Sequence, residues 1–259
     1  MYLICVLITV STSIKTFAQA EKENAYFTAS EMPDMLKWYQ APPKTDSDEF
    51  ARDIRRYYWG KKQRLNPERA AIAIRDSYYG LETIIREFSF PFGLQISWQN
   101  TKEIYTLLRD ALATTDSICK IPKQVYMRQR PFMFFNEETL IPNDEASLRV
   151  NGSFPSGHTI LGVSAALLLS EINPEAADTL LARGIMYGES RVIVGAHWQS
   201  DIEAGFYAAS VAYMKLHTSE RFLRQMEAAR KEFLDLKGKY PPIESEDMLK
   251  DSACITYIK

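Results

Sequence analysis

The sequence predicts an all-α protein, and three observations lead to that prediction. Apolar residues recur at helical spacing in most segments after residue 46. No segment sustains the alternation of apolar and polar residues that is typical of strands. Hydrophobic residues make up 46% of the 259 residues, which is enough for a sizeable core. The length suits one large domain or two small ones.

The first twenty residues are typical of an export signal. Residues 2–10 form an apolar run too short to span a bilayer, and Ala18 to Ala20 form an A-x-A cleavage pattern. We therefore expect a signal peptide over residues 1–20 that is removed from the mature protein. No positive charge precedes the apolar run, so a buried N-terminal helix or a retained anchor stays open as the alternative.

Cleavage at that point would leave 239 residues with 30 basic and 33 acidic side chains, a net charge of about −3. This balance argues against nucleic acid or an anionic membrane surface as a partner. Two cysteines would remain, Cys119 and Cys254, and an oxidising compartment favours one disulfide bridge between them. Two unpaired thiols are the alternative, because the sequence does not show how far apart they lie.

The rest of the chain divides into an extended arm over residues 21–46, a helical domain over residues 47–237 and a polar tail over residues 238–259. In the arm, polar residues and two adjacent prolines disfavour regular structure. In the domain, Ser47 or Asp48 is placed to cap the first helix, which we expect to run to about residue 65.

Proline at the first turn and apolar residues at helical spacing predict a second, continuous helix from residue 66 to a break at residues 91–93. The same periodicity predicts helices at residues 104–112, 159–169, 175–187, 197–217 and 219–237. None is long and apolar enough to cross a bilayer, so we expect no membrane span in the mature chain. Residues 121–155 are irregular, and such loops can direct side chains at a site.

Three cationic residues, Lys123, Arg130 and Arg191, are candidates for a phosphate site. A phosphate monoester carries up to two negative charges, and a site without metal must offer it fixed positive charge and N–H donors. The arginine forks match pairs of oxygens, while lysine acts as a point charge. Taken singly, such residues are usually solvated surface charges, and we expect Arg128 to be one.

The segment Pro155-Ser156-Gly157-His158 directly precedes an apolar helix. Ser156 is placed to cap that helix, whose first N–H groups have no internal partner and form an anion site. Gly157 lets the backbone approach a bound anion closely. A plain serine cap beside an incidental histidine is the alternative for these four residues alone.

His197 and Asp201 lie four residues apart, which on a helix places both on one face. Asp201 would accept the Nδ1–H of His197 and leave Nε2 as a lone pair, ready to act as nucleophile or base. A surface pair is the alternative. His217 has no such neighbour and is expected to be an exposed helix residue. No HExxH, CxxC or phosphate-binding Gly-rich loop is present, so we expect no metal and no cofactor.

Together, these segments resemble the three-part signature of the type 2 phosphatidic acid phosphatase superfamily, which includes the vanadium haloperoxidases. The signature reads Lys123-x6-Arg130-Pro131, Pro155-Ser156-Gly157-His158 and Ser190-Arg191-x5-His197-x3-Asp201. Residues 152–159 and 195–201 are similar to those of the class A bacterial non-specific acid phosphatases. Phe154 stands where that family usually has Tyr, and Ala196 fills a variable position, but the signature is complete.

The resemblance implies a single-domain helical bundle that works in the periplasm as a homo-oligomer at acidic pH. It implies that His197 attacks phosphorus to form a phosphohistidine, that Asp201 orients it, and that His158 donates a proton to the leaving oxygen. The remaining groups would hold the phosphate oxygens: Lys123, Arg130, Arg191, the Ser156 hydroxyl and the Gly157 N–H. Small phosphate monoesters of many kinds would be the substrates, and transfer of phosphate to alcohols is a further hypothesis.

Three other functions compete with this one. A vanadium haloperoxidase would use the same pocket, but the short chain and the residues around the motifs argue against it. A membrane lipid phosphatase would need several apolar spans. A non-catalytic phosphate-binding protein would not need His158, His197 and Asp201. In a phosphatase the two histidines need opposite protonation states at one pH, so we expect a bell-shaped rate profile centred below neutrality.

Overall fold

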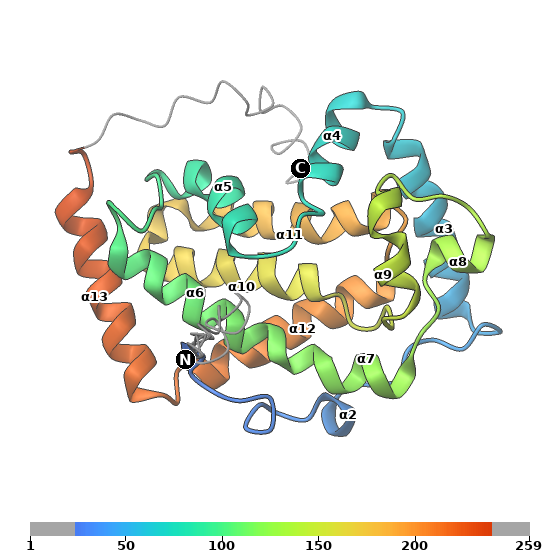
Figure 1. Ribbon diagram of the computed structural model, residues 1–259, viewed down its shortest axis with the longest axis horizontal. Coiled ribbons are helices and arrows are strands. Elements are labelled where there is room, and N and C mark those ends of the chain that lie inside the picture. Colours follow the sequence, from blue (N-terminus) through green and yellow to red (C-terminus); the bar gives the residue numbers. More distant parts are fainter. Residues whose placement is uncertain (1–23, 240–259) are drawn as a thin grey trace, which may run out of the picture.

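The computed structural model describes residues 24–239, and every regular element in that range is helical (Figure 1). Three long helices form the centre: α10 (Gly157–Ile172), α11 (Ala177–Ile193) and α12 (Gln199–Leu216). Helix α10 packs against the other two and against α6 (Lys102–Asp116), so most of its residues are buried. The prediction of an all-α fold is confirmed for the described residues.

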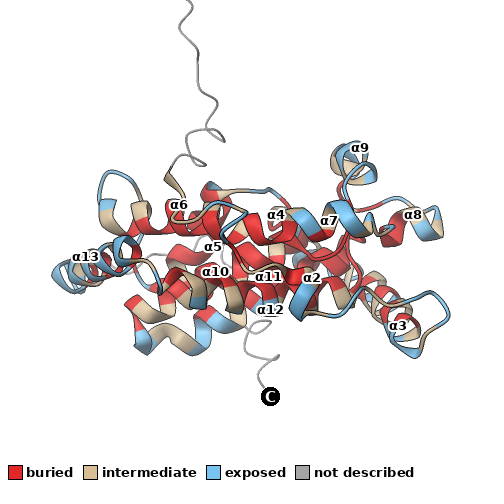
Figure 2. Cartoon of the chain, turned by 90° about the horizontal axis from the view of Figure 1, so that it is seen from below, coloured by how far each residue is buried: buried red, intermediate tan, exposed pale blue. Residues whose placement is uncertain are grey.

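The other helices cover this centre. Helix α13 (Glu220–Leu236) packs on α6, while α3 (Asp48–Gln63) and α4 (Pro67–Arg75) pack on α11. Helix α5 (Leu81–Phe92) contacts both α10 and α11. The short helices are α2 (Met35–Trp38), α7 (Lys120–Tyr126), α8 (Pro131–Phe135) and α9 (Glu145–Arg149), with 3₁₀ turns at Ser117–Cys119, Pro142–Asp144 and Pro174–Ala176. Buried residues concentrate in the central helices, so the apolar core lies between them (Figure 2).

Polar caps start several helices near the residues at which the sequence predicts a helix to begin. The Ser47 Oγ accepts the Phe50 N–H at 3.2 Å at the start of α3, and Asn66 caps α4. At the start of α13, the Ser219 Oγ accepts the Phe222 N–H at 3.3 Å. Each cap satisfies an N–H group that the helix leaves without a partner, which is why these starts are readable from sequence.

Helices α11 and α12 both approach the start of α10 closely. A Cβ added to Gly205 of α12 would lie 2.8 Å from the Thr159 Cβ of α10, closer than two carbon atoms pack. A Cβ at Gly188 of α11 would lie 3.0 Å from the Thr159 Oγ1. Glycine at both positions therefore lets the first turn of α10 lie between its two neighbours. This packing brings the helix ends that carry the sequence motifs into one place.

The prediction of a continuous helix from residue 66 to residues 91–93 is wrong, because the chain breaks between α4 and α5. Asp76 ends α4, and the Ser77 hydroxyl donates back to the Ala73 carbonyl oxygen at 2.9 Å. Gly80 has φ +125°, a conformation that L side chains rarely adopt, so the chain turns there. The apolar periodicity hid this break because it continues into α5. The loop that results carries Ser77 into the site described below.

Helix α11 is longer than predicted. It continues past residue 187 to Ile193, so Arg191 lies in its last turn. Residues 121–155, predicted to be irregular, contain α7, α8 and α9, each shorter than eight residues. Such short helices carry too few turns for a periodic apolar pattern to reveal them.

Helix α12 begins later than predicted. Its first residue is Gln199, so His197 precedes the helix and does not share a helical face with Asp201. Asp201 instead occupies the third position of α12, where its carboxylate accepts the Trp198 N–H at 2.9 Å. A capping interaction, rather than the expected face of a helix, therefore brings the two motif residues together.

The described part of the predicted arm, residues 24–46, packs against the helical domain. The Tyr26 N–H donates to the Thr114 Oγ1 of α6 at 2.8 Å, and Met32 and Met35 are buried. The predicted signal peptide and Cys254 lie outside the described residues. No helix in the range 24–239 combines the length and apolar character that crossing a membrane requires.

The prediction that His217 is an exposed residue without a neighbour is wrong. His217 is the C-cap of α12 and is partly buried. Its Nδ1 lies 2.9 Å from the Tyr213 carbonyl oxygen, and its Nε2 lies 3.1 Å from the Glu171 Oε2 at the end of α10. Because Glu171 is far away in the sequence, local spacing could not reveal this pair.

Candidate active site

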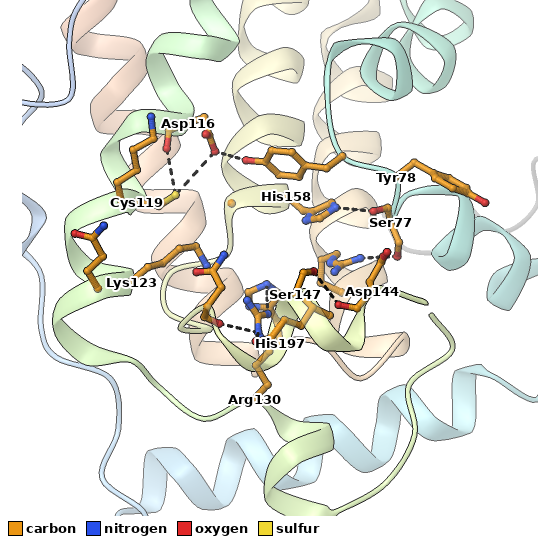
Figure 3. Close-up of a pocket in the computed structure, with 17 residues that line it drawn as sticks. Ser77, Tyr78, Asp116, Cys119, Lys123, Arg130, Asp144, Ser147, His158 and His197 are labelled. Atoms are coloured by element: carbon orange, nitrogen blue, oxygen red, sulfur yellow. Dashed lines mark hydrogen bonds between the residues drawn. The ribbon is translucent and has the colours of Figure 1, made fainter. Parts of the chain in front are cut away.

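A cavity of about 520 Å³ opens where the ends of the central helices meet (Figure 3). Its walls come from the α4–α5 loop, the end of α6, α7, the α9 region, the first turn of α10 and the end of α11. Six of the eight residues predicted for the site line it: Lys123, Arg130, Gly157, His158, Arg191 and His197. The other two, Ser156 and Asp201, are fully buried next to this lining. Three segments that are distant in sequence thus converge on one cavity.

The start of α10 presents its N-terminal end to the cavity. Ser156 caps the helix, with its Oγ accepting the Thr159 N–H at 3.3 Å, and its own N–H donates to the Asp201 carbonyl oxygen at 3.0 Å. The amides of Gly157 and His158 have no acceptor within the helix. A Cβ at residue 157 would lie 3.1 Å from the Tyr79 hydroxyl, so glycine keeps this end of the helix open. The helix therefore offers N–H donors and a positive dipole end to an anion.

Arg130 is held by backbone carbonyl groups rather than by a carboxylate. Its Nε donates to Leu148 and Asn151 oxygens at 2.9 and 3.1 Å, and its Nη1 donates to the Ala196 oxygen at 2.9 Å. Arg130 is only 2% exposed to solvent. Burial, and next the nearby Arg191, lower the pKa of Arg130 to about 10. The guanidinium is thus fixed in place while its positive charge stays unpaired by any carboxylate of the described residues.

Lys123 and Arg191, which also line the cavity, form no ion pair with a carboxylate of the described residues either. The Lys123 ammonium donates to the Gly152 carbonyl oxygen at 2.8 Å, and the Arg191 Nη1 donates to the Ser77 hydroxyl. Burial is the main cause that lowers the pKa of Lys123 to about 8 and that of Arg191 to about 10. Two buried arginines and the partly buried Lys123, none of them in an ion pair within the described chain, disfavour one another. A bound anion would relieve that cost.

His197 has its two ring nitrogens in different environments. Nδ1 lies 3.2 Å from the Asp201 Oδ2. Nε2 lies 3.1 Å from the Arg130 Nη1 (Figure 3). Because Asp201 accepts from Nδ1–H and Arg130 donates, Nε2 carries the lone pair and faces the cations. Burial first, and then Arg130, lower the pKa of His197 well below its usual value. Both effects favour the neutral form of the ring, which the two contacts hold in one orientation.

His158 lies on the opposite side of the cavity. Its Nε2 is 3.0 Å from the Ser77 carbonyl oxygen, which fixes a proton on that nitrogen because a carbonyl group only accepts. The Tyr79 ring meets the imidazole edge-on, with centroids 4.8 Å apart. Burial first, and then Arg191, lower the pKa of His158 well below its usual value. An anion between the cations would act in the opposite direction and favour the protonated ring.

Arg128 is not the surface charge that the sequence predicts. Its side chain is 8% exposed and bridges two buried carboxylates, Asp53 at 2.7 Å and Asp201 at 2.5 Å. The sequence signal was its place two residues before Arg130 in the same motif, but spacing cannot reveal a partner on α3. Among the cavity residues, Ser77 and Tyr79 were also missed, because the loop between α4 and α5 was predicted to be helical.

Cys119 lines the cavity wall and is buried, and burial is the main cause that raises the pKa of its thiol to about 12. Since its predicted partner Cys254 is not described, the disulfide bridge stays a prediction. Within residues 24–239, no group of three or more His, Cys, Asp or Glu side chains is arranged to hold a metal ion.

Comparison with known proteins agrees with this geometry. The family model described as the PAP2 superfamily matches residues 105–221, which include all three motifs. A non-specific acid phosphatase of Providencia stuartii is 39% identical over 213 residues, covering 82% of this chain and 86% of that protein. A non-specific acid phosphatase of Salmonella typhimurium is 36% identical over 223 residues, with 86% and 89% covered. An acid phosphatase of Zymomonas mobilis is 33% identical over 215 residues, with 83% and 81% covered.

The chain thus has the helical fold of the PAP2 superfamily, a family of enzymes, and its helix ends bring cations and two histidines into one cavity. Within that superfamily, the chain belongs to the non-specific acid phosphatases, whose likeness to it extends over more than four fifths of its length. The family resemblance drawn from the three motifs is confirmed.

Proposed function

We propose that this chain hydrolyses phosphate monoesters of many kinds at acidic pH, without a metal, through a phosphohistidine on His197. The observation that carries the proposal is the environment of that ring. Asp201 holds Nδ1 at 3.2 Å, and Arg130 lies 3.1 Å from Nε2 in a cavity that Lys123 and Arg191 also line. An oriented lone pair beside an anion site is what attack on phosphorus requires.

In the first step, a bond forms between the His197 Nε2 and phosphorus, and the bond from phosphorus to the leaving oxygen breaks. Lys123, Arg130 and Arg191 stabilise the charge on the three equatorial oxygens, together with the first amides of α10. Ser156 is expected to support those amides through its cap and, as proposed from the motif, to offer its hydroxyl. Protonated His158 gives the proton of Nδ1, the ring nitrogen that the Ser77 carbonyl group does not hold, to the leaving oxygen.

In the second step, a water molecule attacks the phosphohistidine from the side that the leaving group has vacated. His158, now neutral, takes a proton from that water, and the bond between His197 and phosphorus breaks. Asp201 stabilises the cationic ring while it carries phosphate. An alcohol that replaces the water would receive the phosphate instead, which is the basis of the proposed phosphotransferase activity.

The leaving group would extend towards the mouth of the cavity. Gln124, Ser147, Leu148 and Asn151 also line the cavity, and all four come from the segment between residues 121 and 155. None of these four side chains carries a charge, so they offer no ion pair that would select one ester. This supports broad use of phosphate monoesters rather than one substrate.

We further propose that the protein is exported to the periplasm through residues 1–20, works as a homo-oligomer and contains the Cys119–Cys254 bridge. The A-x-A pattern at Ala18 to Ala20 supports export, and the two cysteines after it support the bridge. The homo-oligomer rests on the family resemblance alone. Expression of the whole chain with periplasmic fractionation, followed by mass analysis of the mature N-terminus, tests the first statement. Mass analysis without reductant tests the bridge.

One experiment tests the central proposal. Purified mature protein is assayed with p-nitrophenyl phosphate in the presence of a strong chelator, and the enzyme is then denatured rapidly at alkaline pH, where phosphohistidine survives. We expect turnover that the chelator leaves unchanged and a phosphate adduct on His197. Loss of activity with chelator, or an adduct elsewhere, would contradict the mechanism.

The same protein also tests the rival functions. Bromide oxidation with vanadate and peroxide, in the absence of phosphatase turnover, would assign a haloperoxidase. Binding of phosphate without any turnover would assign a phosphate-binding protein. Neither alternative is favoured by an observation of its own.

A further inference from the structure

We infer that Arg128 and Asp53 together set the charge around the Asp201–His197 pair, which makes Arg128 a positioning residue for the reaction. The inference rests on the proposed function, because it explains how the proposed nucleophile is kept ready. Its residues come from α3, from the loop before α8 and from α12, so no single motif contains them.

The two carboxylate oxygens of Asp201 accept hydrogen bonds from different partners. The Oδ2 accepts from the His197 Nδ1 at 3.2 Å and from the Trp198 N–H at 2.9 Å. The Oδ1 accepts from the Arg128 Nη1 at 2.5 Å. The carboxylate therefore cannot rotate without losing a contact on one side. Arg128 fixes the oxygen that His197 does not use, and in this way it aims the oxygen that His197 does use.

Arg128 is itself fixed by a second carboxylate. Its Nη2 donates to the Asp53 Oδ2 at 2.7 Å, and Asp53 accepts the Ser200 N–H at 2.8 Å through its other oxygen. The Ser200 hydroxyl contacts both Asp53, at 2.5 Å, and the Arg128 Nη1, at 2.8 Å. The planar fork of arginine is needed here, because it spans two carboxylates in one plane.

Burial makes this arrangement electrostatically strong. Asp53 and Asp201 are 0% exposed, and the Arg128 side chain is 8% exposed. Burial alone lowers the pKa of Arg128, but Asp201 and Asp53 outweigh it and raise that pKa. Charges shielded from water interact over the distances seen here far more strongly than charges at the surface.

The net charge of these residues changes in step with the proposed reaction. Asp53, Arg128 and Asp201 together carry one net negative charge, and His197 is neutral before it reacts. When the bond to phosphorus forms, the imidazole ring becomes cationic, and the four groups together become neutral. The network therefore favours the phosphorylated ring more than the free ring, which is the condition for catalysis. Without Asp53, the same step would leave one uncompensated positive charge.

Other charged groups also face His197, and any test of pH dependence must hold them constant. They are Lys123 from α7, Arg130 before α8, His158 from α10 and Arg191 from α11. All four lie on the cavity side of the ring, whereas Asp201 and Arg128 lie on the other. Changes to Asp53 or Arg128 therefore alter the charge behind the ring and leave the phosphate cations in place.

The test compares charge changes of opposite sign. Asp53→Asn removes a negative charge, so the acidic limb of the kcat/KM profile should move to lower pH. Arg128→Met removes a positive charge, so the limb should move to higher pH. Each shift should be on the order of half a pH unit or more. Arg128→Lys keeps the charge and loses the fork, so it should lower kcat by about tenfold without moving the limb, the scale of one charged hydrogen bond.

Ser200→Ala is the matched control, because it removes contacts to Asp53 and Arg128 without changing any charge. The inhibition constant of inorganic phosphate and the near-ultraviolet circular dichroism should stay close to those of the parent in every variant. Shifts of the same sign in Asp53→Asn and Arg128→Met, or no shift in either, would overturn the inference. So would a shift in Ser200→Ala as large as theirs.

Titration of His197 by NMR keeps the inference testable if activity fails. The pKa of the ring should fall in Asp53→Asn and rise in Arg128→Met, whether or not the protein hydrolyses esters. An inactive parent protein with these opposite shifts would reject the proposed function and support the charge network. An active parent protein in which both variants shift the pKa in the same direction would support the proposed function and reject the charge network. If Arg128→Met does not fold, the shift of the His197 pKa in Asp53→Asn, compared with that in Ser200→Ala, decides the question.

Discussion

The two histidines of the cavity are held in different ways. His197 is bound by a carboxylate, Asp201, that lies only four residues along the chain and is itself paired with Arg128. His158 is bound by the neutral carbonyl group of Ser77, which lies 81 residues away. No ion pair of the described residues involves His158. One ring thus has a fixed counter-charge and the other has none.

This difference matches the different roles that we propose for them. A nucleophile that becomes cationic needs a negative charge that is present before the reaction begins. A proton donor must take up its proton when substrate arrives and give it away one step later. A carboxylate beside His158 would hold that proton too firmly, whereas a carbonyl group leaves its pKa under the control of the bound phosphate.

The largest effect should come from His197→Ala. Loss of the nucleophile should lower kcat by at least about 10⁴-fold, because the covalent route is closed. Steady-state assays with p-nitrophenyl phosphate measure this. His217→Ala is the matched control, since that histidine lies at the far end of α12 and touches no cavity residue, and it should retain parental kcat. Activity close to that of the parent in His197→Ala would show that His197 is not the nucleophile, and the proposed difference between the two histidines would be wrong.

The effect of His158→Ala should depend on the leaving group. With an alkyl phosphate, whose alkoxide needs a proton, kcat should fall by about 10²- to 10⁴-fold. With p-nitrophenyl phosphate, whose phenolate leaves unprotonated, the fall should be about tenfold or less. The ratio of the two effects is the measurement. Equal losses for both esters would show that His158 binds or positions phosphate rather than donating a proton.

The same contrast explains what the sequence could predict. The all-α fold, the caps of α3 and α10 and the residues that converge on the cavity were accessible, because each depends on local chemistry or on a complete motif. Asp201 was paired with His197 correctly, although through a cap and not along a helical face. Short-range signals therefore sufficed for the His197 side of the cavity.

The His158 side could not be predicted in the same way. Its partner is a backbone carbonyl group, which every residue possesses, in a loop that apolar periodicity concealed. Arg128 was misjudged for a related reason, because its partner Asp53 comes from α3 and only the packing of α3 against α11 and α12 brings them together. Contacts between distant elements leave no pattern in a single sequence.

Ser77→Ala separates the two roles of that loop. The substitution removes the hydroxyl that contacts Arg191 and leaves the carbonyl oxygen that accepts from His158. Inorganic phosphate should inhibit at least about tenfold less strongly, because that is the scale of one hydrogen bond to a charged group. Ser77→Thr keeps the hydroxyl and should bind phosphate as the parent does. The ratio of alkyl to aryl turnover should stay parental in both, and a change in it would place the hydroxyl on the path of the proton.

The smallest effect is a pH dependence of the free energy of unfolding, to which both histidines contribute. Burial lowers the pKa of both histidines well below the value of about 6.5 that they have in an unfolded chain. The unfolded chain therefore takes up protons that the folded chain refuses, and the free energy of unfolding falls as the pH drops below about 6.5. Thermal unfolding between pH 7.5 and 5 measures the loss, which should amount to a few degrees in Tm.

Saturating phosphate then distinguishes the rings. Its charge should favour protonated His158, so the stabilisation by phosphate should grow as the pH falls, while His197 stays neutral behind its cations. In His158→Ala this growth should disappear, whereas in His197→Ala it should remain. Glu87, whose pKa is lowered to about 2 by Arg75 and Arg183 against the effect of burial, titrates outside this pH window and does not interfere. Growth that survives in His158→Ala would assign the proton uptake to another group and remove the contrast between the two sides of the cavity.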